Sequence, residues 1–494
     1  MKKYFPPKLL ALSLAMFGLP ACTNDFEGIN TNPNVPNAVT PDLLLPNVIR
    51  STVNATTNES WGVGNIVVQH TAKIQFVNED RYLWGERNEI WNTMYGQLRD
   101  VNNIYQAAST ASPVQKNYQA IALIMRSWMF SLLTDAYGDV PYSEATRGKD
   151  VRYFPKYDPQ EAIYNGILQE LGEASNLLDR ANEVVNGDIL FNGDVSKWKK
   201  LANSLRLRYL VRISNRRNVG AEMQAIVGNP TATPVFAGNA DNAALRYLAS
   251  PPNNFPLYNS RVGSFDEYRL SKTLSDRLIE FNDPRLSVLA RPTVASVTAG
   301  RPQYVGVPNG LDDVSALAYN GGAQNISRVG ATYYIDGFGT PTDASLNIAR
   351  GIIMNYAELQ FILAEAAQKG LITTGTARGY YEEGIKASFN FYGLEVPAGY
   401  LAQPGVAFEP ANALQLIGTQ KWIAFFYSGL EAWFDWRRTG YPDLRPGQSN
   451  LNNNRIPVRY IYPGSEFSLN RTAVEAAIAT QGPNDLNTPV WWDK

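Results

Sequence analysis

The sequence predicts a mainly α-helical protein that also carries a large, irregular, loop-rich part. Apolar residues recur at three- and four-residue steps in several long stretches, which is the period of an amphipathic helix. Between residues 229 and 349, by contrast, this periodicity is weak, and Pro, Gly, Asn and Tyr are frequent. Such a segment is too long for a linker inside a compact chain, and long irregular segments of this kind usually carry function.

The amino end has the features of an export signal. Three lysines among the first eight residues precede an apolar run from Leu9 to Phe17. That run is shorter than the roughly 20 apolar residues that a membrane span needs. It leads to Leu19-Pro20-Ala21-Cys22, which resembles the lipobox of bacterial lipoproteins and contains the single cysteine of the chain. We expect residues 1–21 to be a signal peptide and Cys22 to be acylated, rather than a stray buried thiol.

The segments after Cys22 differ in composition. Residues 22–40 are rich in Asn and poor in apolar side chains, which is typical of a polar tether between a lipid anchor and a folded body. We expect a single body over residues 41–494. Its helical scaffold should span about 41–228 and 350–440, and its loop-rich part about 229–349 and 441–494.

The composition excludes several classes of site. Without Cys22 no thiol remains for a disulfide or a thiolate metal site. His70 is the single histidine, so a multi-histidine metal centre is excluded, and its apolar neighbours favour a structural imidazole. Removal of residues 1–21 would delete three lysines and no acid, which leaves 41 basic and 45 acidic residues. This balance does not indicate a nucleic-acid partner.

Four helices are predicted in the first half of the scaffold. Periodic apolar residues mark helices over 88–108, 115–133 and 161–178, the last preceded by Pro159. The fourth, 196–217, contains eight basic residues and no acid. A nucleic-acid surface is one interpretation. We favour a packed helix whose arginines pair with acids of neighbouring helices, because the whole chain is not basic.

The second half of the scaffold begins at Asn355. Asn355 and Glu358 have the spacing of a capping box, and Gly370 is a stop signal. A partner helix is predicted over about 377–392, so the pair resembles a tetratricopeptide-type hairpin. A further helix is predicted over about 411–437. Its Trp422, Phe426, Trp433 and Trp436 follow helical steps and are expected to fill core.

Beyond these patterns, the chain resembles the SusD/RagB family of surface nutrient-binding lipoproteins, in its SusD-like branch. Nine motifs carry the resemblance, in the family's order and over nearly the whole mature chain. They are Asn30–Asn34, Asp135–Tyr142, Trp198–Arg212, Asp283–Leu286, Tyr304–Gly310, Tyr356–Ala366, Gln420–Pro442, Tyr462–Asn470 and Val490–Asp493.

The resemblance implies a non-catalytic binding protein with tetratricopeptide-like helix pairs as its scaffold. It also implies a partner, a SusC-like TonB-dependent transporter of the outer membrane, over which such proteins sit like a lid. The protein would face the cell exterior on its lipid anchor, capture oligosaccharides or peptides, and pass them inward.

Two loop segments have the composition of a sugar site, in which flat rings are paired with amides or arginines. We predict ligand contact by residues of both segments and by one further tyrosine: Arg81, Tyr82, Trp84, Asn253, Asn254, Phe255, Tyr258, Arg261 and Tyr319. The family resemblance does not assign these residues to a ligand site, because loops are the part of the family that varies most.

Several alternatives remain open at this stage. The ligand could be a peptide instead of an oligosaccharide. A surface glycoside hydrolase would need two carboxylates at a fixed separation, and no acid lies in a recognisable catalytic motif. A purely structural lipoprotein is a third possibility. No cofactor is predicted. A structural calcium ion is possible, but Asp312-Asp313 lacks the spacing of a known calcium loop, so we assign no metal site.

Overall fold

The computed structural model describes residues 39–148, 151, 153–178, 184–259, 266–334 and 341–494. The chain divides into two compact units, Met1–Thr40 and Pro41–Lys494. The predicted signal peptide and Cys22 lie outside the described residues. Among the helices described, none combines the length and the apolar character needed to cross a membrane.

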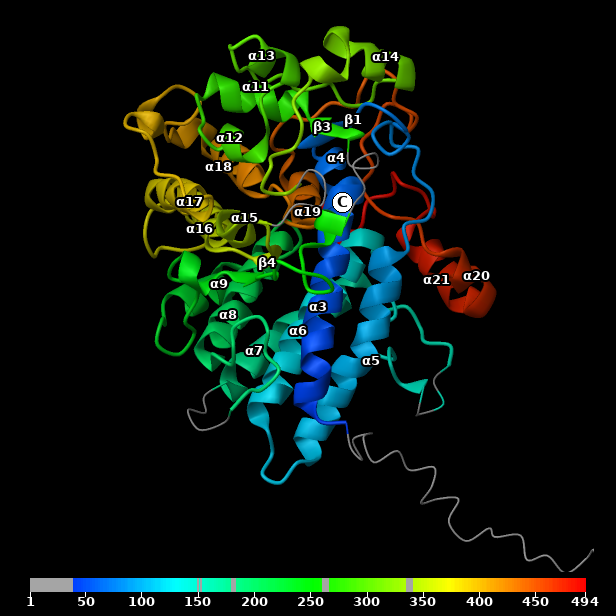
Figure 1. Ribbon diagram of the computed structural model, residues 1–494. Helices are drawn as coiled ribbons and strands as arrows, with labels where there is room; N and C mark the ends of the chain where they lie inside the picture. Colours follow the sequence, from blue (N-terminus) through cyan, green and yellow to red (C-terminus); the bar gives the residue numbers. More distant parts are fainter. Residues whose placement is uncertain (1–38, 149–150, 152, 179–183, 260–265, 335–340) are drawn as a thin grey trace, which may run out of the picture. The chain divides into compact units, whose positions relative to one another are not determined.

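Long helices form the first part of the second unit, and each packs on the next one along the chain (Figure 1). They are α3 (Pro41–Glu59), α5 (Glu89–Thr110), α6 (Lys116–Tyr137), α7 (Gln160–Leu177) and α8 (Val195–Arg212). Three predicted helices are thus confirmed as α5, α6 and α7. The basic helix is confirmed as α8, but it ends at Arg212, five residues early, where Ser214 and Asn215 favour a turn.

Helix α3 is not among the helices predicted from the sequence, and its composition explains why. Its second half contains threonines, which are weak helix formers. In the structure Thr52 and Thr56 donate their hydroxyl hydrogens to the carbonyls of Val48 and Val53, one turn back along the helix. These bonds satisfy the buried hydroxyls.

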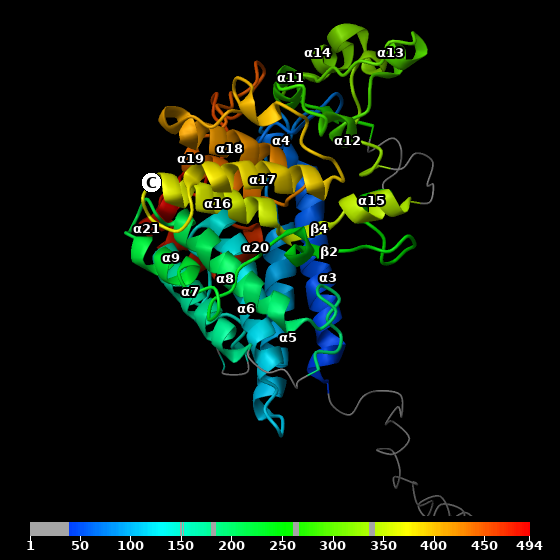
Figure 2. The ribbon, with the colours of Figure 1, turned by 90° about the vertical axis from the view of Figure 1, so that its left-hand side faces the viewer.

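A second helical layer lies against the first (Figure 2). It consists of α16 (Tyr356–Gln368), α17 (Ala377–Phe391), α18 (Ala413–Ala424) and α19 (Glu431–Thr439). The hairpin of α16 and α17 confirms the predicted helix pair. Asn355 caps α16, since its Oδ1 accepts from the Glu358 N–H at 2.7 Å. The Glu358 carboxylate, however, binds Arg208 instead of returning to the cap.

The single helix predicted over about 411–437 is wrong, because two helices occupy this range. α18 ends at Ala424 and α19 begins at Glu431. Tyr427 and Gly429 between them have φ angles of 58° and 68°. This left-handed conformation cannot continue a right-handed helix. The expectation that the aromatic residues fill core is confirmed: Trp422, Phe426 and Trp433 are buried, and Trp436 packs against the core.

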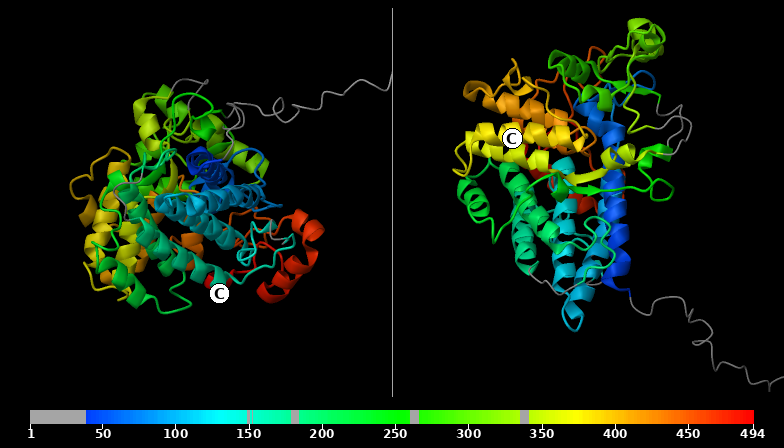
Figure 3. Two further views of the ribbon diagram at one scale, coloured as in Figure 1. Left: turned by 90° about the horizontal axis from the view of Figure 1, so that it is seen from below. Right: turned by 60° about the vertical axis from the view of Figure 1, so that its left-hand side comes forward.

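Short elements connect and flank the two layers. They are a π-helical turn (Ser60–Gly64), α4 (Asn65–Val67), α9 (Gly220–Val227), α11 (Lys272–Glu280), α12 (Leu286–Leu289), α13 (Val294–Thr298), α14 (Asp313–Ala318), α15 (Asp343–Ile348), α20 (Gly464–Leu469) and α21 (Arg471–Gln481). In the described residues, two antiparallel ribbons complete the fold, β1 (Thr71–Lys73) with β3 (Tyr268–Leu270) and β2 (Ala243–Leu245) with β4 (Gly351–Met354). The mainly helical fold class is confirmed. β4 lies against α3, as the views of Figure 3 also show.

Buried ion pairs join the two helical layers, and α8 supplies their cations. The Arg208 guanidinium binds both oxygens of Glu358 on α16 at 2.5 Å. Arg212 lies 3.5 Å from Asp135 on α6 and also binds Glu431 on α19. These pairs confirm that the arginines of the basic helix meet acids of neighbouring helices.

We expect Glu358→Gln to lower the free energy of unfolding by about 3 kcal/mol, because it leaves the Arg208 charge buried without its closest counter-ion. Urea unfolding followed by circular dichroism measures this loss. Glu475→Gln is the matched control, since the Arg471–Glu475 pair on α21 is exposed, and it should cost less than about 1 kcal/mol. Equal effects of the two substitutions would contradict a structural role for the buried pair.

Candidate ligand-binding site

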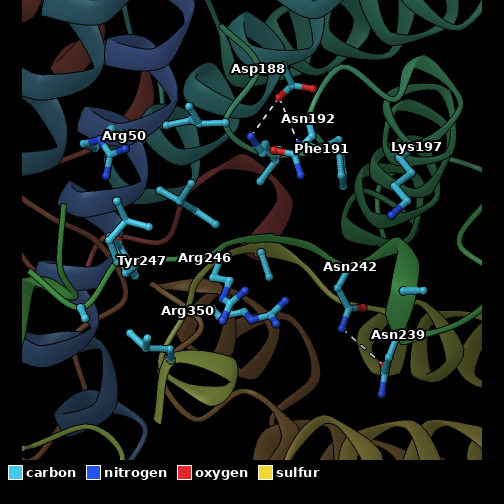
Figure 4. Close-up of a pocket in the computed structure, with 18 residues that line it drawn as sticks. Arg50, Asp188, Phe191, Asn192, Lys197, Asn239, Asn242, Arg246, Tyr247 and Arg350 are labelled. Carbon is cyan, nitrogen blue, oxygen red and sulfur yellow. Dashed lines mark hydrogen bonds between the residues drawn. The ribbon is translucent and has the colours of Figure 1, made fainter. Parts of the chain in front are cut away.

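A cavity of about 800 Å³ opens beside the β2–β4 ribbon, which is a size typical of small-molecule sites (Figure 4). Its walls come from the loop 188–192, from α3 and the start of α8, from β2 and the residues that follow it, and from Arg350 just before β4. Four cationic side chains line it: Arg50, Lys197, Arg246 and Arg350. Asn192, Asn239 and Asn242 add amides.

The loop 188–192 is shaped by Asp188. Its carboxylate accepts from the backbone N–H groups of Leu190 and Phe191 at 2.9 and 3.1 Å. It also accepts from the Gly193 N–H and from Trp198 Nε1, at 2.9 and 2.8 Å. Asp188 is the one acid lining this cavity within the described residues, and it is occupied by its own loop.

Asn239 and Asn242 are held in place by the second helical layer. Asn239 Nδ2 donates to the Ala387 carbonyl on α17 at 2.9 Å. Asn242 Oδ1 accepts from the Tyr356 N–H at the start of α16 at 2.6 Å. Each amide nitrogen carries two hydrogens, so both residues retain a donor that can serve a ligand.

A second hollow of about 490 Å³ adjoins the first and shares Asn239, Asn242 and Arg350 with it. It adds Asn347 from α15, Asn390 from α17 and the half-buried ring of Phe391. The two hollows together offer amides, cations and one partly exposed ring, which are the groups that hold the hydroxyl edge and the apolar face of a sugar.

The first predicted loop segment is mostly part of the core. Tyr82 and Trp84 are only 1% and 8% exposed. The ring of Trp84 stands edge-on to those of Trp433 and Tyr460, and its Nε1 donates to the Glu79 carbonyl. Arg81 is half-buried and donates to the Ser449 carbonyl at 2.8 Å.

The second predicted segment lies beside the cavity. Asn253 is half-buried, and its carbonyl accepts from the N–H of Leu248, a lining residue. Asn254, Phe255 and Tyr258 are buried, and Phe255 packs edge-on against the lining residue Tyr247. Arg261 lies outside the described residues. Tyr319 is half-buried and packs on a separate small cluster around Ile74 and Val307.

The structure therefore does not gather the predicted residues around one cavity, and the buried rings offer little surface to a ligand. Ligand contact by these residues stays a prediction. The cationic and amide lining was missed because Arg246 and Arg350 are about a hundred residues apart. No local pattern reveals that their strands pair.

Asp312 and Asp313 have structural partners. Asp312 caps α14 by accepting from the Ser315 N–H at 3.0 Å, and Asp313 accepts from the Val77 N–H at 3.4 Å. No group of three or more His, Cys, Asp or Glu side chains is placed to hold a metal ion within the described part of the chain.

The comparisons with known proteins identify the family. The family model described as "Starch-binding associating with outer membrane", SusD-like, matches residues 33–463. This chain belongs to the SusD-like family. SusD-like proteins are non-catalytic binding proteins, which confirms that the chain is not an enzyme and removes the hydrolase alternative.

Solved structures agree over nearly the whole chain. A SusD homologue from Bacteroides fragilis has 31% identity and a TM-score of 0.79, covering 92% of this chain and 100% of its own. A Bacteroides vulgatus outer membrane protein linked to nutrient binding has 30% identity, the same coverage and a TM-score of 0.79. A chitin-binding protein has 30% identity and a TM-score of 0.76, covering 92% of this chain and 99% of its own. A search of curated proteins gave no significant match.

His70 is a buried structural residue, as the sequence predicts. It is 0% exposed, and its Nε2 lies 2.9 Å from the Trp422 carbonyl. Burial lowers the pKa of the imidazole from 6.5 to about 3. Below pH 6.5 the imidazole gains a proton in the unfolded chain, whereas in the folded protein it stays neutral down to about pH 3. The contribution of neutral His70 to the free energy of unfolding is therefore complete above pH 6.5 and is lost as the pH falls toward 3.

We expect the imidazole of His70 to stay neutral from pH 8 down to pH 5. The chain has a single histidine, so the ¹³Cε1 resonance of tag-free protein labelled at histidine reports this group alone. Its chemical shift should not move over that range. A titration with a midpoint near pH 6.5 would contradict the buried placement.

Proposed function

We propose that this protein captures oligosaccharides at the cell surface and passes them to a SusC-like TonB-dependent transporter. The observation that carries the ligand assignment is the pair of adjoining hollows, which are lined by amides, by arginines and, in the smaller hollow, by a partly exposed ring. Such groups fit a hydroxyl-rich ligand, because each hydroxyl both donates and accepts. A relative that is a chitin-binding protein supports the same ligand class.

The two hollows also indicate the length of the ligand. Their volumes of about 800 and 490 Å³ exceed what a single sugar ring fills, and they share three lining residues. An oligosaccharide of several units could therefore run from one hollow into the other past Arg350. A protein of this kind would select chains over monosaccharides.

Isothermal titration of the mature protein should show heat with one or more oligosaccharides and none with the corresponding monosaccharides. Asn242→Ala removes a donor shared by the two hollows, so we expect it to weaken binding roughly tenfold, as for a lost hydrogen bond in a desolvated site. Asn102→Ala on α5, a residue of a different hollow, is the control and should not change the affinity. Heat with peptides and with no glycan would show that the ligand class is wrong.

We further propose that Cys22 anchors the protein in the outer membrane and that the body faces the exterior. Mass spectrometry of protein extracted from membranes should find fatty acyl groups on Cys22 at the mature amino terminus. Cys22→Ser should release the protein from the membrane fraction, because the only acylation site is lost. Co-purification with a TonB-dependent barrel tests the partner, and a membrane-bound Cys22→Ser variant would contradict the anchor.

A further inference from the structure

The β2–β4 ribbon brings two arginines together at one of its ends, where both line the larger cavity. In its register Leu245 pairs with Gly351, and Arg246 directly follows β2 while Arg350 directly precedes β4, so the two arginines lie at the same end of the ribbon. Two like charges held near each other repel. Figure 4 shows both guanidinium groups reaching the same part of the cavity. The two arginines therefore repel each other in the folded protein.

No carboxylate neutralises the two arginines within the described residues. Neither Arg246 nor Arg350 forms an ion pair there, and Asp188 binds four N–H groups of its own region. Arg50 and Lys197 add positive charge to the same cavity. Lys197 is offset in part by Asp194, which caps α8 and does not line the cavity.

Arg350 is partly removed from water as well. Its Nε is buried and has no hydrogen-bond partner in the described structure. Within the described residues, the hydrogen bond of its side chain is a long one, 3.5 Å from Nη2 to Asn347 Oδ1. Burial and the nearby Arg246 charge lower the pKa of its guanidinium. A buried donor without a partner carries a free-energy cost that a bound acceptor would remove.

We infer that this cavity binds a negatively charged group, a carboxylate or a sulfate, on the oligosaccharide that the protein captures. The inference rests on the proposed function and narrows it to acidic glycans, such as those that contain uronates or sulfated sugars. A guanidinium donates two parallel hydrogen bonds to either group, and two guanidiniums can hold the anion from both strands. The adjoining amide-lined hollow would hold a neutral unit of the same chain.

The test is isothermal titration of the mature protein with matched probes. They are tetragalacturonate, a sulfated chondroitin tetrasaccharide, the neutral tetrasaccharides of glucose and N-acetylglucosamine, and a peptide of four glutamates. We expect one of the acidic oligosaccharides to bind at least tenfold more tightly than either neutral one. We also expect its affinity to fall between 50 and 500 mM NaCl, because salt screens partly exposed charges.

Substitutions test whether these two arginines bind the acidic oligosaccharide. Arg246→Gln and Arg350→Gln should each weaken binding of the acidic oligosaccharide roughly tenfold or more, as for lost charge-assisted hydrogen bonds. Arg99→Gln on α5, where the arginine side chain is 77% exposed, should leave binding unchanged. The melting temperatures of the two cavity variants at low salt should equal or exceed that of the native protein, since each removes a repulsion.

The outcomes distinguish a failure of this inference from a failure of the proposed function. Equal affinity for neutral and acidic oligosaccharides, unchanged in both cavity variants, would overturn this inference and leave the proposed function standing. Binding of the glutamate peptide with no response to any glycan would overturn both. A fall in melting temperature for both cavity variants would show that the arginines hold the fold rather than a ligand, and would also overturn the inference.

Discussion

The position of the candidate cavity depends on one buried ion pair, Arg208 with Glu358. It joins α8 of the first helical layer to α16 of the second, and it is almost wholly removed from water. Arg208 Nη2 also donates to the Ile353 carbonyl of β4 at 2.8 Å. The Arg208 guanidinium therefore contacts both helical layers and β4, the strand that Arg350 directly precedes. Because an unpaired charge at this depth is costly, the arrangement is specified tightly.

The pairing of charges distinguishes the arginines of the helical scaffold from those of the cavity. Arginines of the scaffold, such as Arg212 and Arg438, lie against carboxylates that offset their charge. Arg246 and Arg350 lie at a cavity and meet no carboxylate in the described residues. In a chain with nearly equal numbers of acids and bases, this local imbalance is what supports the inference that the cavity takes a negatively charged group.

Local sequence predicted the features that depend on neighbours along the chain. The helix boundaries of α5, α7 and α17 follow from apolar periodicity, and the Asn355 cap follows from its own side chain. The pairing of the basic helix with acids followed from overall charge balance. Three features depend on distant contacts and could not be read locally: the break between α18 and α19, the burial of Trp84 and Phe255, and the pairing of β2 with β4. Aromatic loops looked like ligand surfaces because composition does not distinguish a ring that stacks on sugar from one that packs on Trp433.

The most direct measurement is a crystal structure of the mature protein with a bound oligosaccharide. The account predicts sugar density in the two adjoining hollows, with polar atoms of the ligand within hydrogen-bond distance of Arg350 and Asn242. Density confined to another surface, such as the loop that exposes Phe76 and Leu83, with both hollows filled only by water, would contradict it.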